Sequence, residues 1–220
     1  MTVTTTPTHG EAVPTAAPHE IVRYSWLERL LHWTVAITFI ALMLSGMALA
    51  YPRAAWLSRL FGGGQTMRAA HPWIGLVFTA ATVLMAGRWL RGMLFDATDR
   101  AWFKRIGQYA REGHAGVDTG RWNGGQKAYF WFAVVLTLGL LLTGIPLWFP
   151  WMAGVGVRQL ARLLHHVGYL LMVGGFIIHV LLSAVLFPGT MAGMTSGRVS
   201  RAWAAYHHPR WFRQQEDADQ

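Results

Sequence analysis

Four histidines stand in or beside long apolar runs of this 220-residue chain: His32 in "ERLLHW", His71 in "RAAHPW", and His165 and His179 in "LLHHVGYLLMVGGFIIHV". A neutral imidazole is a common metal ligand, and a polar group inside a membrane needs a partner. The sequence holds no cysteine, which excludes disulfides, thiolate-held iron–sulfur clusters and covalent haem attachment through C-x-x-C-H. Any redox cofactor of this chain must therefore be held by other ligands.

The histidines belong to four predicted membrane spans. Hydrophobic residues make up 53% of the chain and charged residues only 13%, against roughly 25% charged in soluble domains. Crossing the hydrocarbon takes about 20 apolar residues. Four stretches are long enough, at about 27–50, 70–90, 128–149 and 161–187. We therefore expect an all-α integral membrane four-helix bundle.

The basic residues predict how this bundle is oriented. An even number of spans puts both termini on one side, and the segments on that side hold 14 of the 19 Lys and Arg residues. The positive-inside rule therefore predicts cytoplasmic N and C termini. The net charge of +9 suits lipid headgroups rather than nucleic acid, because the basic residues lie between apolar runs.

Depth in the membrane sorts the histidines into two pairs. His71 begins the second span on the outer side, and His32 begins the first span on the cytoplasmic side. The fourth span enters from outside, so that His165 is shallow and His179 lies about 21 Å deeper. At about 100° per residue, a spacing of 14 falls about 40° short of four turns, and His165 shares a face with His179. We expect His165, rather than its neighbour His166, to pair with His71, and His179 to pair with His32.

Two depth-matched pairs of imidazoles in a helical bundle favour two non-covalent b-type haems with bis-histidine ligation. A single imidazole could instead hydrogen-bond another helix. Zinc fits poorly, because each level offers two histidines and no nearby Cys, Asp or Glu, and the spans lack the carboxylates of a proton relay. Gly46 stands at the outer level and could leave room for a macrocycle, although glycines also let helices pack closely. His166 stays open as an alternative ligand.

Five segments carry a family resemblance: "RYSWLERLLHW", "RAAHPWIG", "GRWNGGQKAYFW", the histidine spacing of the fourth span, and "GRVSRAWAAYHHPRW". From about residue 21 onward the chain resembles the gamma subunit of respiratory formate dehydrogenase, the membrane cytochrome b of that complex. Other four-helix cytochromes b, including hydrogenase partners, share the histidine frame. The segments "NGGQK" and "HHPRW" make the resemblance to formate dehydrogenase more specific.

The resemblance implies roles for particular residues. His71 and His165 would ligate an outer haem b, and His32 and His179 an inner haem b. A site for menaquinone or ubiquinone would lie beside the inner haem, with its polar motif on Asn123 and Gln126. These two side chains could hydrogen-bond a quinone carbonyl, but Asn is also an ordinary residue at a helix start.

The resemblance also implies partners and location. An iron–sulfur beta subunit and a molybdenum or tungsten catalytic alpha subunit would oxidise formate outside the cytoplasm. The present chain would anchor them in the bacterial inner membrane and pass electrons to quinone, so that formate oxidation belongs to another subunit. Trimers of the whole complex occur in the family. The alternatives are a cytochrome b of a hydrogenase or another molybdoenzyme, and a cofactor-free membrane transporter.

The chain divides into three predicted parts. Residues 1–20 have neither an apolar core nor a basic start, which predicts a disordered tail rather than a signal peptide. Residues 21–200 form the four-span domain, and residues 201–220 a cytoplasmic tail. In that tail we expect His207 and His208 to be solvated or in contact with another subunit. The long segment before the third span predicts an interfacial helix.

Overall fold

The computed structural model describes residues 19–112 and 116–218. The predicted disordered tail lies outside the described residues, except for its last two positions.

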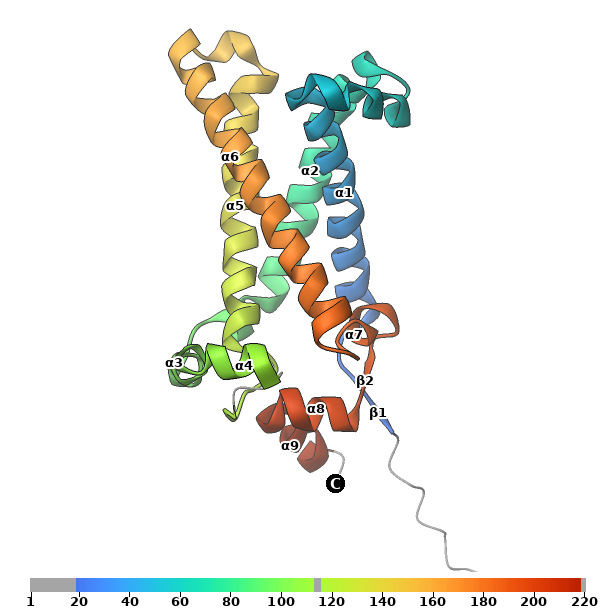
Figure 1. Cartoon of the computed structure of the whole chain (residues 1–220), viewed down its shortest axis with the longest axis vertical. Helices are drawn as coiled ribbons and strands as arrows, with labels where there is room; N and C mark the ends of the chain where they lie inside the picture. The colour runs from blue at the N-terminus through green and yellow to red at the C-terminus, as the bar shows by residue number, and fades with distance from the viewer. Residues whose placement is uncertain (1–18, 113–115, 219–220) are drawn as a thin grey trace, which may run out of the picture.

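Four long helices form the body of the structure: α1 (Trp26–Ala50), α2 (Gly64–Trp89), α5 (Gly124–Trp148) and α6 (Val155–Val180). Each is long and apolar enough to cross a membrane. Helix α1 packs mainly along α2, and α5 along α6, in an upright bundle (Figure 1). Only 6–17% of their most apolar windows is buried inside the chain, so the remaining apolar surface suits bilayer hydrocarbon. The predicted all-α membrane bundle is confirmed.

The helices begin earlier than their apolar runs. Helix α2 starts at Gly64 rather than near residue 70, and α6 starts at Val155 rather than near residue 161. Hydropathy detects only the part of a helix that lies in hydrocarbon, whereas the backbone hydrogen bonds continue into the polar interface. At its other end α6 continues through a π-helical segment, Leu181–Leu186, which stops before Pro188.

Short elements cover the two ends of the bundle. At one end, η1 (Pro52–Phe61) joins α1 to α2, and η3 (Pro150–Met152) joins α5 to α6. At the other end lie η2 (Leu90–Met93), α3 (Ala97–Lys104), α4 (Ile106–Glu112), α7 (Ala192–Thr195), α8 (Arg201–His207) and α9 (Pro209–Ala218) (Figure 1). The segment expected to hold one interfacial helix therefore holds two short helices, α3 and α4.

A two-stranded antiparallel ribbon joins the two ends of the described chain. Strand β1 (Glu20–Val22) pairs with β2 (Arg198–Ser200), with Ile21 opposite Val199. The sequence did not predict this ribbon, because its two partners are far apart in the chain. Both ends of the described chain lie at the same end of the bundle, as an even number of spans requires (Figure 1).

A buried carboxylate ties three parts of this end together. Glu28 is 4% exposed and forms a capping box with Ser25 at the start of α1. Its Oε1 atom accepts a hydrogen bond from Trp89 Nε1 at 2.7 Å and another from Arg121 Nη2 at 3.1 Å. Helices α1 and α2 are thereby fixed to the segment that leads into α5.

The C-terminal helices dock through a buried cation and a buried imidazole. Arg23 is 2% exposed, its Cζ atom lies 4.5 Å from the Trp211 ring centroid, and it donates to the Arg121 carbonyl. His208 is 1% exposed and lies between Arg23 Nη2, at 3.3 Å, and the Gly120 carbonyl, at 2.9 Å. Burial, and next the Arg23 cation, hold the pKa of His208 well below its ordinary value, so that the ring is neutral. The expectation of a solvated His208 is therefore wrong.

A buried ion pair fixes α3 to α5. Lys127 Nζ lies 2.7 Å from Asp99 Oδ2, and both side chains are at least 94% buried. Lys127 also donates to the Leu94 carbonyl at 2.9 Å. Both charges are almost completely removed from water. Loss of either partner would therefore leave a buried charge without a counter-charge.

Removal of the lysine should therefore destabilise the protein. We expect Lys127→Met to cost about 3–5 kcal/mol, the usual effect of leaving one charge of a buried pair alone. Thermal unfolding of the detergent-solubilised protein measures it, with Arg91→Met, at an exposed position, as the matched control. The double variant Lys127→Met with Asp99→Asn should recover part of the loss. Equal melting temperatures for Lys127→Met and the control would contradict a stabilising role.

Candidate haem-binding site

The outer pair of histidines comes from α2 and α6. The ring centroids of His71 and His165 lie 6.5 Å apart, with 62° between the ring planes. His71 lies about two turns into α2, and Pro72 directly after it is inside the helix, where it cannot donate a backbone hydrogen bond. The two helices face each other at this level without being neighbours in sequence.

The inner pair comes from α1 and α6. The ring centroids of His32 and His179 lie 6.3 Å apart, with 48° between the planes. Tyr129 of α5 also stacks on His179, almost parallel to the imidazole, at 4.7 Å and 6°. The structure thus brings together the same two pairs that depth and helical angle predict, and haem ligation by them stays a prediction.

The separations of both pairs suit one metal ion between two imidazoles. An imidazole nitrogen binds a transition metal at about 2.0–2.1 Å, and the ring centroid lies roughly 1.1 Å farther back, which places the two centroids about 6.2 Å apart. The measured values are 6.3 Å and 6.5 Å. Among the described residues, no group of three or more His, Cys, Asp or Glu is arranged to hold a metal ion. The donor set at each level therefore fits an axially ligated haem iron better than a tetrahedral zinc ion.

Two hydroxyl groups that sequence reasoning missed contact the outer imidazoles. Ser45 Oγ lies 2.7 Å from His71 Nδ1, and Thr143 Oγ1 lies 3.0 Å from His165 Nδ1. A hydrogen bond at Nδ1 leaves Nε2 as the nitrogen available for a metal. Ser45 stands 13 residues after His32 in the sequence, and a small hydroxyl within an apolar span was the only available signal for it.

The adjacent histidine points away from this pair. His166 Nε2 lies 3.1 Å from the hydroxyl of Tyr51, which follows the last residue of α1. The structure therefore gives His166 a partner at the end of α1 and places His165 opposite His71.

Glycines adjoin both outer rings. A Cβ atom added at Gly46 would lie 3.8 Å from Cε1 of His71, and one added at Gly144 would lie 3.5 Å from Cε1 of His165. Gly46 is thus at the outer level, where the sequence placed it. Gly175 is different, because a Cβ atom there would meet the Phe132 ring at 2.5 Å. That glycine allows α5 and α6 to pack closely.

The proposed quinone motif forms the start of α5. Asn123 Oδ1 accepts from the Gln126 backbone N–H at 2.9 Å, and Gln126 Oε1 accepts from the Asn123 N–H at 3.0 Å. This reciprocal capping box uses the side-chain oxygens, so the NH₂ groups are the donors that each amide has left to offer. Burial raises the pKa of the nearby Tyr109 hydroxyl, and its hydrogen bond with Asn123 acts in the opposite direction.

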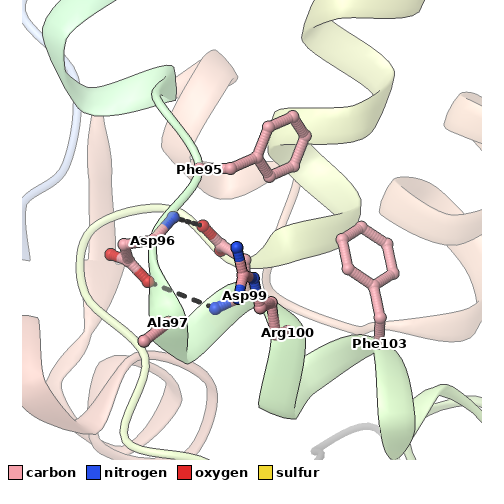
Figure 2. Close-up of a pocket in the computed structure, with 6 residues that line it drawn as sticks. All are labelled: Phe95, Asp96, Ala97, Asp99, Arg100 and Phe103. Carbon is pink, nitrogen blue, oxygen red and sulfur yellow. Dashed lines mark hydrogen bonds between the residues drawn. The ribbon is translucent and has the colours of Figure 1, made fainter.

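An open pocket of about 610 Å³ lies at the start of α3. Its lining consists of Phe95, Asp96, Ala97, Asp99, Arg100 and Phe103, as Figure 2 shows. Asp96 and Asp99 cap each other there, with bonds of 2.7 Å and 3.2 Å (Figure 2). Phe103 adjoins α5, because a Cβ atom on Gly124 would lie 3.3 Å from its ring. The pocket therefore borders the capping box, although neither amide nor any paired histidine lines it.

Comparisons with known proteins agree with this geometry. The family model of prokaryotic cytochrome b561 matches residues 23–197. The nitrate-inducible formate dehydrogenase cytochrome b556(Fdn) subunit of Escherichia coli (strain K12) is 34% identical over 203 residues, which cover 90% of this chain and 93% of that protein. The cytochrome b556(fdo) subunit of formate dehydrogenase from the same strain is 35% identical, covering 88% and 92%.

A relative from another organism is similar over the same part of the chain. The formate dehydrogenase cytochrome b556 subunit of Haemophilus influenzae (strain ATCC 51907 / DSM 11121 / KW20 / Rd) is 32% identical, covering 89% of this chain and 83% of that protein. The match extends over all four membrane helices and both histidine pairs. The chain therefore belongs to the prokaryotic cytochrome b561 family, and is a multi-pass membrane protein that carries b-type haem.

Proposed function

We propose that this chain is the dihaem cytochrome b subunit of a respiratory formate dehydrogenase. It anchors the complex and carries electrons from an iron–sulfur subunit across the membrane to quinone. The observation that carries this proposal is the presence of two imidazole pairs at two depths, each at the spacing of one metal ion. The three relatives, all cytochrome b556 subunits of formate dehydrogenases, support the choice of complex.

Each pair of imidazoles would hold one haem. His71 and His165 would hold the outer haem, and His32 and His179 would hold the inner haem. Bound haem supplies one-electron chemistry, while the protein sets the ligands, the spacing and the surroundings of the iron. Helix α6 contributes one ligand to each level, so its rigidity fixes the distance between the two sites.

The orientation follows from the distribution of charge. The outer segments 51–68 and 150–162 hold 5 arginines and no carboxylate, whereas 14 basic residues accompany the termini. The termini therefore lie in the cytoplasm of a bacterium, and the chain lies in its inner membrane. An electron moving inward works against a membrane that is negative inside, at about 2.3 kcal/mol per 100 mV for a full crossing. The drop in redox energy from donor to quinone must exceed that cost.

The quinone site lies at the cytoplasmic start of α5. Tyr129, less than one turn after Gln126, stacks on His179, which supports a quinone within reach of the inner haem. The amide NH₂ groups of Asn123 and Gln126 suit a quinone carbonyl, which only accepts hydrogen bonds. The capping box holds both amides in fixed positions. The substrate is menaquinone or ubiquinone.

The partners follow from the same proposal. An iron–sulfur beta subunit delivers electrons to the outer haem, and a molybdenum or tungsten alpha subunit oxidises formate. Membership of a haem-protein family argues against a cofactor-free transporter. A hydrogenase or another molybdoenzyme as the partner would appear as a different subunit in copurification.

Ligand variants test which of the adjacent histidines matters. We expect His165→Ala to remove one of two b-type haems, because His71 then faces no second imidazole. His166→Ala should keep both haems, since His166 contacts Tyr51 instead. Reduced-minus-oxidised spectra of the purified complex, with haem content per chain, measure the difference. Loss of the outer haem from His166→Ala alone would contradict the assignment.

The quinone site is tested by a pair of helix-cap variants. In isolated membranes, formate should reduce both haems, and a quinone-site inhibitor should block their reoxidation. We expect Asn123→Ala to slow reoxidation without slowing reduction by formate, because a donor to quinone is lost. Ser25→Ala is the matched control, since it removes the corresponding N-cap of α1 at a similar cost of about 1 kcal/mol.

One result would count against this site, and another against the proposed complex. Equal reoxidation rates in Asn123→Ala and Ser25→Ala would remove Asn123 from it. Haems that formate does not reduce in wild-type membranes would contradict the proposed complex.

A further inference from the structure

We propose that Ser45 and Thr143 are positioning residues for the outer haem, and that their hydroxyl groups lower its reduction potential. They do so by accepting the Nδ1 protons of His71 and His165. The inference rests on the proposed function, because it needs a haem between each pair of imidazoles. The four histidine ligands alone would make the two haem sites alike, whereas hydroxyl groups in the described part of the chain contact only the outer pair.

The proton positions around Ser45 follow from the number of donors. Its Oγ atom lies 2.8 Å from the Ala41 carbonyl and 2.7 Å from His71 Nδ1. A hydroxyl has one proton, and a carbonyl can only accept. The hydroxyl therefore donates to Ala41 O and accepts from the His71 Nδ1–H. This arrangement leaves a lone pair on His71 Nε2, which is the form that binds a metal.

Thr143 repeats the arrangement on α5. Its Oγ1 atom lies 2.7 Å from the Gly139 carbonyl and 3.0 Å from His165 Nδ1. Thr143 Oγ1 therefore accepts from the His165 Nδ1–H, as Ser45 Oγ accepts from the His71 Nδ1–H. Ser45 is also 0% exposed, so no solvent can take its place.

Among the described residues, the inner imidazoles have no such acceptors. His32 Nδ1 is buried and has no hydrogen-bond partner, and no hydrogen bond to His179 is found within residues 19–112 and 116–218. The neighbour of His179 is the Tyr129 ring, which stacks on the face of the imidazole rather than meeting its edge. The outer and inner sites thus share ligand type and spacing, but differ in what holds the second nitrogen of each ring.

This difference changes the electronic character of the ligands. An imidazole that donates its Nδ1–H becomes more basic at Nε2 and favours the oxidised, more positive iron. The two hydroxyls therefore lower the potential of the outer haem and leave the inner haem unaffected, which favours electron flow inward. Arg158 and Arg162 lie in the outer segments and act in the opposite direction, since positive charge favours reduced iron. The absolute potential of the outer haem therefore does not measure the effect of the hydroxyls. The change in that potential when a hydroxyl is removed does.

Redox titration of the purified complex tests this proposal. Ser45→Ala and Thr143→Val should each raise the midpoint potential of the outer haem, which is identified as the haem that His71→Ala lacks. The upward shift should be larger for Ser45→Ala, because Ser45 Oγ lies closer to its imidazole, at 2.7 Å against 3.0 Å for Thr143 Oγ1. The low-spin electron paramagnetic resonance signal of the outer haem should also change. Thr143→Ser keeps a hydroxyl and should keep the wild-type potential.

A buried hydroxyl that touches no histidine provides the control. Thr82 is 4% exposed and donates only to the Phe78 carbonyl, at 2.8 Å, so Thr82→Val should leave both potentials unchanged. Loss of the outer haem from Ser45→Ala or Thr143→Val, with its retention in Thr143→Ser and Thr82→Val, would also support a positioning role.

Other results would overturn the proposal. Unchanged potentials in both Ser45→Ala and Thr143→Val, in a complex that still holds two haems, would overturn this inference alone. A shift of the inner haem instead of the outer one would do the same. A wild-type complex without two haems would overturn the proposed function as well.

Discussion

The structure depends on holding two imidazoles opposite each other at each of two depths in one apolar bundle. Helix α6 supplies a histidine to each level, and α1 and α2 supply one opposite histidine each. A spacing of 14 residues on α6 puts both of its rings on one face. Helices α1 and α2 run in opposite directions, so that each meets α6 at a different level. Close packing of α1 on α2, which are joined through η1, holds the two histidines in place opposite α6.

The two ends of the bundle hold their histidines in different ways. At the end where both ends of the described chain lie, Glu28, the Lys127–Asp99 ion pair and the buried Arg23 join the long helices to the short ones. The inner pair lies directly above this polar layer, with Tyr129 against His179. At the opposite end, hydroxyls and glycines touch the imidazoles themselves. An electron path between these ends would therefore join two sites with equal ligands and unequal surroundings.

Periodicity, depth and hydropathy predicted the spans, the all-α class and the grouping of the four histidines. These features repeat along single helices, so that local sequence contains them. The β1–β2 ribbon and the burial of His208 depend on contacts between residues more than 80 positions apart, and no local pattern specifies such pairs. Ser45 and Thr143 gave a weak signal, because a lone hydroxyl in a span usually bonds only its own helix. Asn123 and Gln126 form a reciprocal helix cap, and their role in a quinone site stays a prediction.

The central claim is that each chain holds two b-type haems, one between each histidine pair. Haem extracted from the purified complex and counted against chain concentration tests this claim most directly, with electron paramagnetic resonance of the oxidised protein to resolve separate low-spin centres. The account predicts two haems per chain and two distinct bis-histidine signals. One haem per chain, or none, would contradict it.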